Sequence, residues 1–315
     1  MKKTIIYIAG YGRSGSTLLD VILGSHPQIM GTGELTNIFD CMDDPASPCS
    51  CGKNVHDCSF WGDVTTHLLR GKGASQKNRG GLLQTSCEEW TNVSLLFNDR
   101  KKKYDGYKIL MTGLFDYLFK IGGREFIVDS SKNAYTSSWR PLALKKICGY
   151  DVKLIHLVRN GQGVMMSKMK GDNTDMRKGI YRRKPFAAIE GLFGWIIANL
   201  VVIITRILLP PKTYYLMKYE DMVREPEKEL IKVGGFLGLD FKETIQSIRR
   251  MKPIPVGHLI SGNRLAHNNS TILIDKDSVR KVSLPVHLSI LYYLAGWPII
   301  AYMWLHNLTR TPYRS

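Results

Sequence analysis

Residues 10–17, GYGRSGST, form a glycine- and serine-rich loop whose residue types suit the binding of an anion. An apolar run over residues 4–9 precedes the loop, and a periodic apolar segment over residues 18–23 follows it. This order predicts a buried strand, a turn and the first turn of a helix. Unpaired N–H groups and the helix dipole favour negative charge at such a helix end. The sequence therefore predicts an anion site here.

The same loop differs from the nucleotide-binding pattern G-x-x-x-x-G-K-[ST] at the lysine position. Gly10, Gly15 and Thr17 fit the pattern, but Ser16 replaces the lysine, and Arg13 supplies a cation instead. Because that lysine reaches the β- and γ-phosphates of a nucleotide, its loss argues against NTP hydrolysis. The variation resembles the 5′-phosphosulfate loop of sulfotransferases that use 3′-phosphoadenosine 5′-phosphosulfate (PAPS). The resemblance implies that PAPS would be bound by Gly12, Arg13, Ser14, Gly15, Ser16, Thr17 and Leu18.

A second anion site is predicted where the apolar run of residues 152–158 ends at Arg159. The string LVRNGQGVMMS resembles the 3′-phosphate motif of sulfotransferases, V-R-[ND]-P-R-x-x-x-x-S. The resemblance implies that Arg159 and Ser167 bind the 3′-phosphate of PAPS. The string departs from the family at Gly161 and Gln162, where Pro-Arg is more frequent. With two anion motifs in the expected order, the chain resembles a PAPS-dependent sulfotransferase of the bacterial or Golgi-like branch.

The resemblance also implies three catalytic residues. Glu34 matches a glutamate that acts as general base, although a helix-capping or solvated glutamate is the alternative. Lys132 ends the string DSSK and would bind the sulfonate or the bridging oxygen; a surface lysine after a strand is the alternative. Arg13 would help Lys132 to stabilise charge on the leaving phosphate. A Walker B role for Asp129 is disfavoured, because the loop lacks the P-loop lysine.

A third resemblance lies in residues 257–264, GHLISGNR, which are similar to a loop that closes over the nucleotide in bacterial sulfotransferases. It implies Gly262, Asn263 and Arg264 as further cofactor-binding residues. His258 is a weaker candidate than Glu34 for the general base. The implied reaction is in-line transfer of the sulfonate of PAPS to a hydroxyl, or to an amine, with release of adenosine 3′,5′-bisphosphate (PAP). No catalytic metal is expected.

Charge and composition narrow the range of partners. The chain of 315 residues carries a formal charge of +17, which implies acidic partners, yet it shows no DNA- or RNA-binding signature. Nucleic acid is therefore not expected. The acceptor stays open among a small natural product, a glycan, a lipid and a tyrosine peptide. Two other functions are considered, a P-loop kinase or NTPase and a non-catalytic nucleotide-binding protein at a membrane.

A cysteine-containing segment over about residues 36–85 is predicted to be a mobile insert. Cys49, Cys51 and Cys58 lie in a C-x-C-G…C…W string that resembles an insert of bacterial sulfotransferases. Zinc sites more often use C-x-x-C pairs. A structural metal, a disulfide and free thiols in a surface loop all remain open. The polar, glycine-rich residues 71–84 predict a loop.

Apolar runs that suit parallel strands alternate with helical segments along the chain. They predict a single domain over residues 1–315 with an α/β fold, a P-loop-type three-layer sandwich in which helices cover both faces of a mainly parallel sheet. The strand candidates are residues 4–9, 126–128, 151–158 and 213–219.

Two apolar segments bear on membrane contact. Residues 185–209 predict a long buried helix, and residues 282–308 contain no Asp, Glu, Lys or Arg. Pro285, Gly296 and Pro298 favour two packed helices in the second segment, and peripheral membrane contact is left open. The apolar run near the N-terminus is too short for a signal peptide, so a cytoplasmic protein with reduced cysteines is expected.

Overall fold

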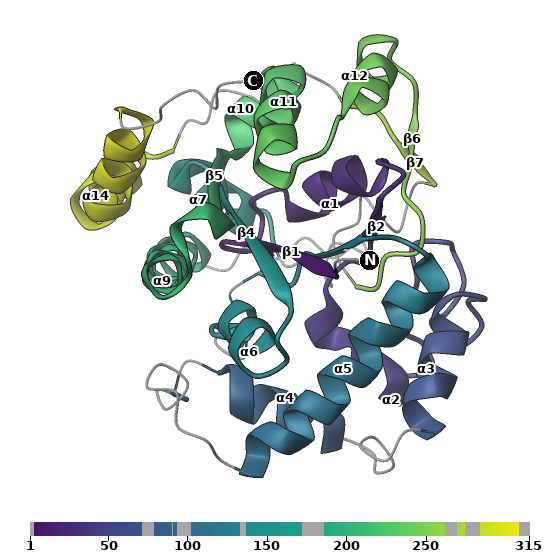
Figure 1. Cartoon of the computed structure of the whole chain (residues 1–315). Helices are drawn as coiled ribbons and strands as arrows, with labels where there is room; N and C mark the ends of the chain where they lie inside the picture. Colours follow the sequence, from purple (N-terminus) through teal and green to yellow (C-terminus); the bar gives the residue numbers. More distant parts are fainter. Residues whose placement is uncertain are drawn as a thin grey trace.

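The computed structural model describes residues 3–70, 79–89, 91–92, 102–132, 137–171, 186–261, 270–274 and 284–308. A five-stranded sheet of parallel strands lies at its centre, in the order β2-β3-β1-β4-β5 (Figure 1). Its strands are β1 (Thr4–Ala9), β2 (Ile29–Gly31), β3 (Phe126–Asp129), β4 (Asp151–Val158) and β5 (Tyr214–Lys218). The strands predicted from the sequence are thus present.

Side chains of β1 alternate between two buried layers, because successive residues of a strand point to opposite faces. Ile5 and Tyr7 belong to one core, whereas Ile6 and Ile8 belong to the other. One layer of helices contains α1 (Ser16–Gly24), α10 (Tyr219–Arg224), α11 (Pro226–Leu237) and α12 (Lys242–Arg249). The opposite layer contains α5 (Lys102–Gly122), α6 (Arg140–Lys146), α7 (Gly161–Met169) and α9 (Ala187–Leu208). The predicted three-layer α/β fold is confirmed (Figure 1).

The cysteine-containing segment is largely helical where the structure describes it. After the 3-10 turn η1 (Leu35–Asn37), it forms α2 (Ile38–Asp43), α3 (Trp61–Arg70) and α4 (Arg79–Glu88). The predicted loop over residues 71–84 is therefore too long, and residues 71–78 lie outside the described part of the chain. Cys49 and Cys58 are buried, so a surface loop is the wrong interpretation for them. The reason is that Trp61, Val64 and Leu68 of α3 anchor the segment in the core.

Residues 286–308 form one helix, α14 (Val286–Leu308), with Pro298 inside it, so the prediction of two helices is wrong. The helix packs against α9 and α7, and this packing supports a continuous helix despite the hydrogen bond that proline removes. The remaining elements are η4 (Pro211–Thr213) and a short antiparallel pair, β6 (Ile254–Pro255) and β7 (Thr271–Ile272).

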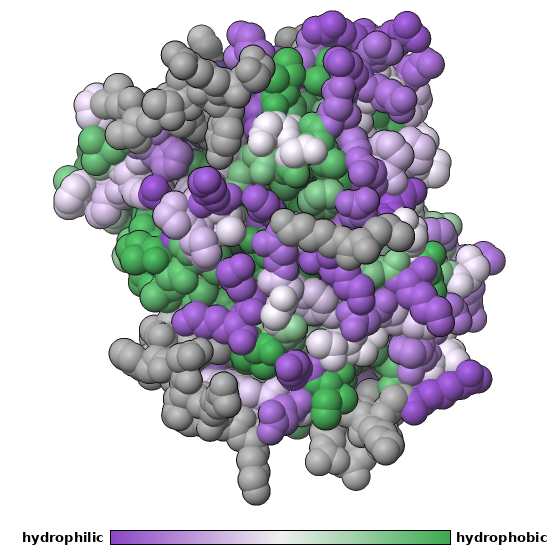
Figure 2. All heavy atoms as spheres, in the orientation of Figure 1, coloured by the Kyte–Doolittle hydropathy of each residue, from purple (hydrophilic) through white to green (hydrophobic). Residues whose placement is uncertain are grey.

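Helices α9 and α14 are long and apolar enough to cross a membrane by length and composition alone. In the most apolar window of each helix, 44% of the residues of α9 and 22% of those of α14 are buried inside the protein. Many apolar side chains therefore face outward, and Figure 2 shows hydrophobic side chains gathered over α9. The large hydrophobic side chains of α9 and α14 that are at least half exposed are Phe193, Ile207, Val286, Ile290, Tyr293, Leu294, Trp297, Trp304 and Leu305.

Candidate active site

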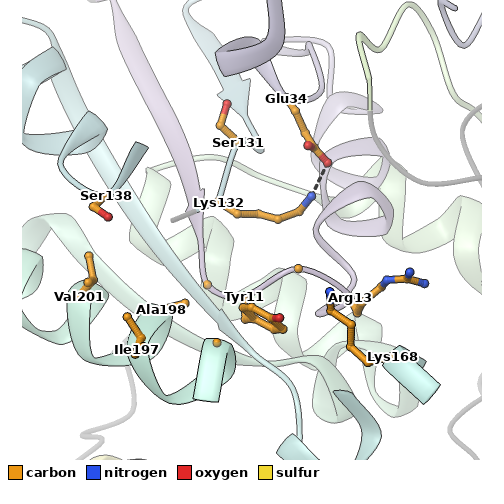
Figure 3. Close-up of a pocket in the computed structure, with 13 residues that line it drawn as sticks. Tyr11, Arg13, Glu34, Ser131, Lys132, Ser138, Lys168, Ile197, Ala198 and Val201 are labelled. Carbon is orange, nitrogen blue, oxygen red and sulfur yellow. Dashed lines mark hydrogen bonds and ion pairs between the residues drawn. The ribbon is translucent and has the colours of Figure 1, made fainter. Parts of the chain in front are cut away.

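A cavity of about 310 Å³ lies where β1 and β3 end and α9 passes over them (Figure 3). Ligands of open parallel sheets bind beyond the carboxyl ends of the strands, which is where this cavity is. One side of the cavity carries polar and charged groups, and α9 supplies an apolar wall. The lining residues are Gly10, Tyr11, Gly12, Arg13, Glu34, Ser131, Lys132, Ser138, Lys168, Gly194, Ile197, Ala198 and Val201.

The loop between β1 and α1 requires glycine at two positions. Gly10 has φ +137°, and a Cβ atom there would lie 2.3 Å from the carbonyl oxygen of Leu157. Gly15 has φ +88°, and a Cβ atom there would lie 2.4 Å from the ring of Tyr219. Larger residues are excluded at both positions. The glycines thus allow the loop to pass close to its neighbours and to begin α1 directly.

Ser14 supplies a polar atom in this loop that finds no partner among the described residues. Its side chain is 2% exposed, and its Oγ makes no hydrogen bond within them. Such a group costs free energy unless a ligand or water completes its bonding. Together with the first backbone N–H groups of α1, which the helix itself cannot pair, the Ser14 hydroxyl fits an oxyanion such as a phosphate.

Arg159 joins the second anion motif to the first. Its Nη1 donates a hydrogen bond of 2.9 Å to the carbonyl oxygen of Arg13, and its guanidinium lies 4.6 Å from the ring centroid of Tyr219. Strands β1 and β4 are neighbours, so both motifs lie at the same end of adjacent strands. Ser167 lies on α7, half-buried. Sequence reasoning gave Tyr219 no role, although its ring borders both motifs.

The departure from the family pattern at Gly161 has a structural reason. A Cβ atom on Gly161 would lie 2.5 Å from Cε2 of Tyr292, which belongs to α14. The ring of Tyr292 is buried there and also contacts Trp195 of α9. Glycine at this position therefore allows the C-terminal helix to pack on the start of α7, where a proline ring would collide with it.

Lys132 and Glu34 form an ion pair inside the cavity (Figure 3). Their side chains are 17% and 19% exposed, so the pair lies in a partly dehydrated setting. Lys132 has φ +66°, a left-handed conformation that non-glycine residues seldom adopt. Its backbone is held by a hydrogen bond from its N–H to the carbonyl oxygen of Ile8, at 3.2 Å, and by the Tyr7 hydroxyl, which donates to its carbonyl oxygen.

The backbone and side chain of Glu34 are both held in place. Its N–H donates to the carbonyl oxygen of Ile260 at 3.0 Å. Asn37 Nδ2 lies 3.4 Å from Glu34 Oε2 and donates at 3.0 Å to the Ser261 hydroxyl. The preceding N–H, that of Gly33, donates at 3.0 Å to Asp20, and burial raises the pKa of Asp20 to about 7.

Asp129 does not face the cavity, and a Walker B role is not supported. It is fully buried and accepts a hydrogen bond of 2.7 Å from Arg140 Nε. Arg140 Nη1 also pairs with Glu88 at 2.5 Å, and the Tyr107 hydroxyl donates to Glu88 at 2.7 Å. Asp129 in turn accepts from the N–H of Ser131 at 3.1 Å. This buried group therefore fixes the strand end that carries Lys132.

Two further cations, Arg13 and Lys168, have different surroundings from that of Lys132. Arg13 donates through Nη2 to the carbonyl oxygen of Gly171 at 2.9 Å, and its side chain extends away from the Lys132–Glu34 pair (Figure 3). Lys168, which sequence reasoning did not select, lines the cavity with its Nζ 5.9 Å from the ring centroid of Tyr11. Lys168 could have been predicted from the sequence, because it directly follows Ser167 of the 3′-phosphate motif. Gly262, Asn263 and Arg264 lie outside the described residues.

Comparisons with known proteins place this site in a family. The sequence model of the sulfotransferase domain family matches residues 3–252. Among solved structures, the sulfotransferase domain of the Synechococcus PCC 7002 olefin synthase is 20% identical, with a TM-score of 0.48 and coverage of 91% of this chain and 92% of that one. The sulfotransferase domain of the curacin biosynthetic pathway is 17% identical, with a TM-score of 0.47 and coverage of 93% and 98%.

A sulfotransferase from Alicyclobacillus acidocaldarius is 14% identical, with a TM-score of 0.43 and coverage of 96% of this chain and 94% of that one. No curated protein sequence gives a significant match. Because the family match covers most of the chain, including the glycine loop, the Lys132–Glu34 pair and Arg159, the chain belongs to the sulfotransferase domain family.

Proposed function

We propose that this sulfotransferase moves the sulfonate of PAPS to a hydroxyl on an acceptor with an apolar skeleton. The Lys132–Glu34 ion pair in a cavity beside the glycine loop carries this proposal. The pair places two groups in one partly buried site: a cation that can stabilise charge on the leaving phosphate, and a carboxylate that can accept the proton of the acceptor hydroxyl.

The described residues fit the phosphates of the nucleotide. The start of α1 and the Ser14 hydroxyl offer donors for the 5′-phosphate. Arg159, held against the loop through Arg13, offers a guanidinium fork for the 3′-phosphate together with Ser167. The flat ring of Tyr219 borders both groups and would shield the nucleotide from water. Gly262, Asn263 and Arg264 are proposed as additional contacts by resemblance alone.

PAPS supplies a sulfonate bonded to a good leaving group, adenosine 3′,5′-bisphosphate. Lys132 would donate to the oxygen that bridges sulfonate and phosphate, and Arg13 would add positive charge at the loop. The ammonium group of Lys132 pairs with the Glu34 carboxylate. An incoming phosphate would compete for the ammonium group and leave the Glu34 carboxylate available as general base for the acceptor hydroxyl.

The wall formed by α9 supports the choice of acceptor. Gly194, Ile197, Ala198 and Val201 line the cavity, and Ile197 is 40% exposed, so it belongs to both the cavity and the outer apolar surface. An alcohol with an apolar skeleton could therefore enter the cavity while its skeleton packs against the apolar side chains of α9. The exposed faces of α9 and α14, with the net charge of +17, also favour peripheral contact with an anionic bilayer.

A transfer assay tests the proposal. The full chain is incubated with PAPS and paired acceptors, such as a long-chain alcohol and a sugar, without added Mg²⁺, and PAP release is measured. PAP release that depends on the apolar alcohol is expected. Mg²⁺-dependent hydrolysis of ATP without any use of PAPS would support a kinase or NTPase instead. Tight PAP binding without transfer to any acceptor would support a non-catalytic nucleotide-binding protein. Sedimentation with anionic and neutral vesicles tests the membrane contact separately.

A further inference from the structure

Three cysteines and a histidine outside the proposed catalytic cavity converge on one point. Cys49, Cys51 and Cys58 come from the segment after α2, and His258 comes from the segment after β6, about 200 residues later. The four possible ligand atoms all lie within 4.8 Å of one another. Cys58 Sγ is 3.2 Å and Cys49 Sγ is 3.9 Å from His258 Nδ1.

These distances match the size of a tetrahedral zinc site. In a regular tetrahedron with Zn–S bonds of about 2.3 Å, neighbouring sulfur atoms lie about 3.8 Å apart. A sulfur atom and a nitrogen ligand lie slightly closer to each other, because the Zn–N bond is shorter. Small side-chain rotations would bring the four atoms to those separations. Three thiolates and one imidazole form a donor set that zinc favours over Mg²⁺ or Ca²⁺, which prefer oxygen. We propose that Cys49, Cys51, Cys58 and His258 bind one structural zinc ion.

Neighbouring groups orient these ligands, as the surroundings of metal sites generally do. The N–H of Trp61 lies 3.5 Å from Cys58 Sγ and can donate to it. The indole Nε1 of Trp61 donates at 2.9 Å to the carbonyl oxygen of His258. The ring of Phe60 stacks on the imidazole, with centroids 5.6 Å apart and 16° between the planes. The aromatic residues of the string CSFW thus present Nδ1 of His258 to the thiols.

The ion would join two segments that border the proposed catalytic base. Residue Ile260 bridges both Cys49 and Gly33, so one short strand-like segment lies between the cluster and the Glu34 loop. Its N–H donates to Thr32 at 2.9 Å, and its carbonyl accepts from Glu34 at 3.0 Å. Ser50 adds a hydrogen bond of 3.2 Å from its N–H to Leu259. Zinc would therefore hold residues 257–261 against the loop that carries Glu34.

Zinc content of the full chain tests the site directly. The protein is purified with a cleavable tag that contains no histidine, in the presence of a phosphine reductant, and its zinc is measured by mass spectrometry. About one zinc per chain is expected in the wild type. Cys51→Ser and His258→Gln should lose it, and Cys148→Ser is the matched control because Cys148 lies outside the cluster. Cys51 is exposed, so its replacement leaves the core packing intact.

Cobalt substitution adds a readout of geometry. A Co²⁺-loaded chain should show the visible absorption of a tetrahedral cobalt–thiolate site, and the two ligand variants should not. Zinc-free wild type after reconstitution, or equal zinc in all variants, would overturn the proposal. A second preparation, purified without reductant, tests for a disulfide: a mass lower by two hydrogens, restored by later addition of reductant, with no metal bound would also overturn the proposal.

The importance of this zinc anchor for catalysis rests on the proposed function, in which Glu34 is the general base. Zinc binding itself does not depend on that function. Hydrogen exchange of the Glu34 and Ile260 amides should be faster in Cys51→Ser than in Cys148→Ser, because the segment has lost its anchor. Unchanged exchange in a zinc-free variant would refute the anchoring role. Failure of sulfonate transfer in the wild type, with zinc bound, would refute the proposed function alone.

Discussion

The guanidinium of Arg159 donates a hydrogen bond of 2.9 Å to the backbone carbonyl of Arg13. One residue follows β4 and the other lies in the loop after β1, so this bond ties together the ends of two adjacent strands. Both predicted phosphate sites thus share one edge of the sheet. The distance between the two anion sites is set by this contact and by the spacing of the two strands.

Replacement of Arg159 by alanine should weaken PAP binding by roughly 10- to 100-fold, because charge-assisted bonds to a phosphate contribute about 1.5–3 kcal/mol each. Ser167→Ala should weaken it less, since a neutral hydroxyl is lost. Isothermal titration calorimetry measures both. Lys146→Ala, which removes a cation outside the cavity, is the control for net charge. Equal affinity in Arg159→Ala and wild type would exclude a role in phosphate binding.

Glu34→Gln should retain PAP binding and lose turnover, because the amide keeps the shape of the side chain but accepts no proton. Lys132→Ala should lose turnover too, and it should also weaken PAPS binding. The transfer assay and calorimetry are run on the same preparations. Full activity in Glu34→Gln would remove Glu34 as the general base and leave it with a positioning role.

Gly161→Ala should lower the thermal stability of the chain, because the added Cβ atom would lie 2.5 Å from the Tyr292 ring. In the double variant Gly161→Ala/Tyr292→Leu, the smaller side chain should restore part of the lost stability. Such a non-additive effect would show that α7 and α14 are coupled. Gly113→Ala is the matched control, since a Cβ atom at Gly113 would meet no neighbouring atom within 4 Å. Purely additive effects on the melting temperature would contradict direct contact.

Arg140→Met should destabilise the protein by about 3–5 kcal/mol, because it leaves the Asp129 and Glu88 carboxylates buried without a counter-charge. Urea unfolding measures the change. Lys228→Met, in an exposed pair with Glu225, is the control and should leave stability nearly unchanged. A small effect of Arg140→Met would contradict a stabilising role for this buried ion-pair group.

Asp20 should make stability fall as pH rises from about 4 to about 7. Burial raises its pKa to about 7 in the folded chain, so the folded state holds a proton that the unfolded state has already released. The contribution lost over this range is about 4 kcal/mol. The Asp20→Asn variant lacks this pH-dependent contribution, and its side-chain amide oxygen can still accept the hydrogen bond from the N–H of Gly33.

Urea unfolding of both proteins at pH 5 and pH 8 provides the measurement. The stability of Asp20→Asn relative to wild type should increase with pH. A difference that is independent of pH would show that the buried carboxyl group does not titrate in this range.

Local patterns were sufficient for much of the fold and the site. Short apolar runs located β1, β3, β4 and β5, because strands buried on both faces of a parallel sheet are apolar along their length. The anion-binding loop could be recognised from the sequence because its backbone accepts only glycine at positions 10 and 15. Lys132, Glu34 and Arg159 were selected by family resemblance, and the structure places them around one edge of the sheet.

The contacts between distant segments were decided only by the tertiary structure. His258 joins Cys49, Cys51 and Cys58 across about 200 residues, and no spacing rule in one sequence reveals such a pairing. Tyr292 explains Gly161 only once α14 is packed on α7. Sequence periodicity reports which side of an element is buried, but the identity of the partner is set by the packing of the whole chain.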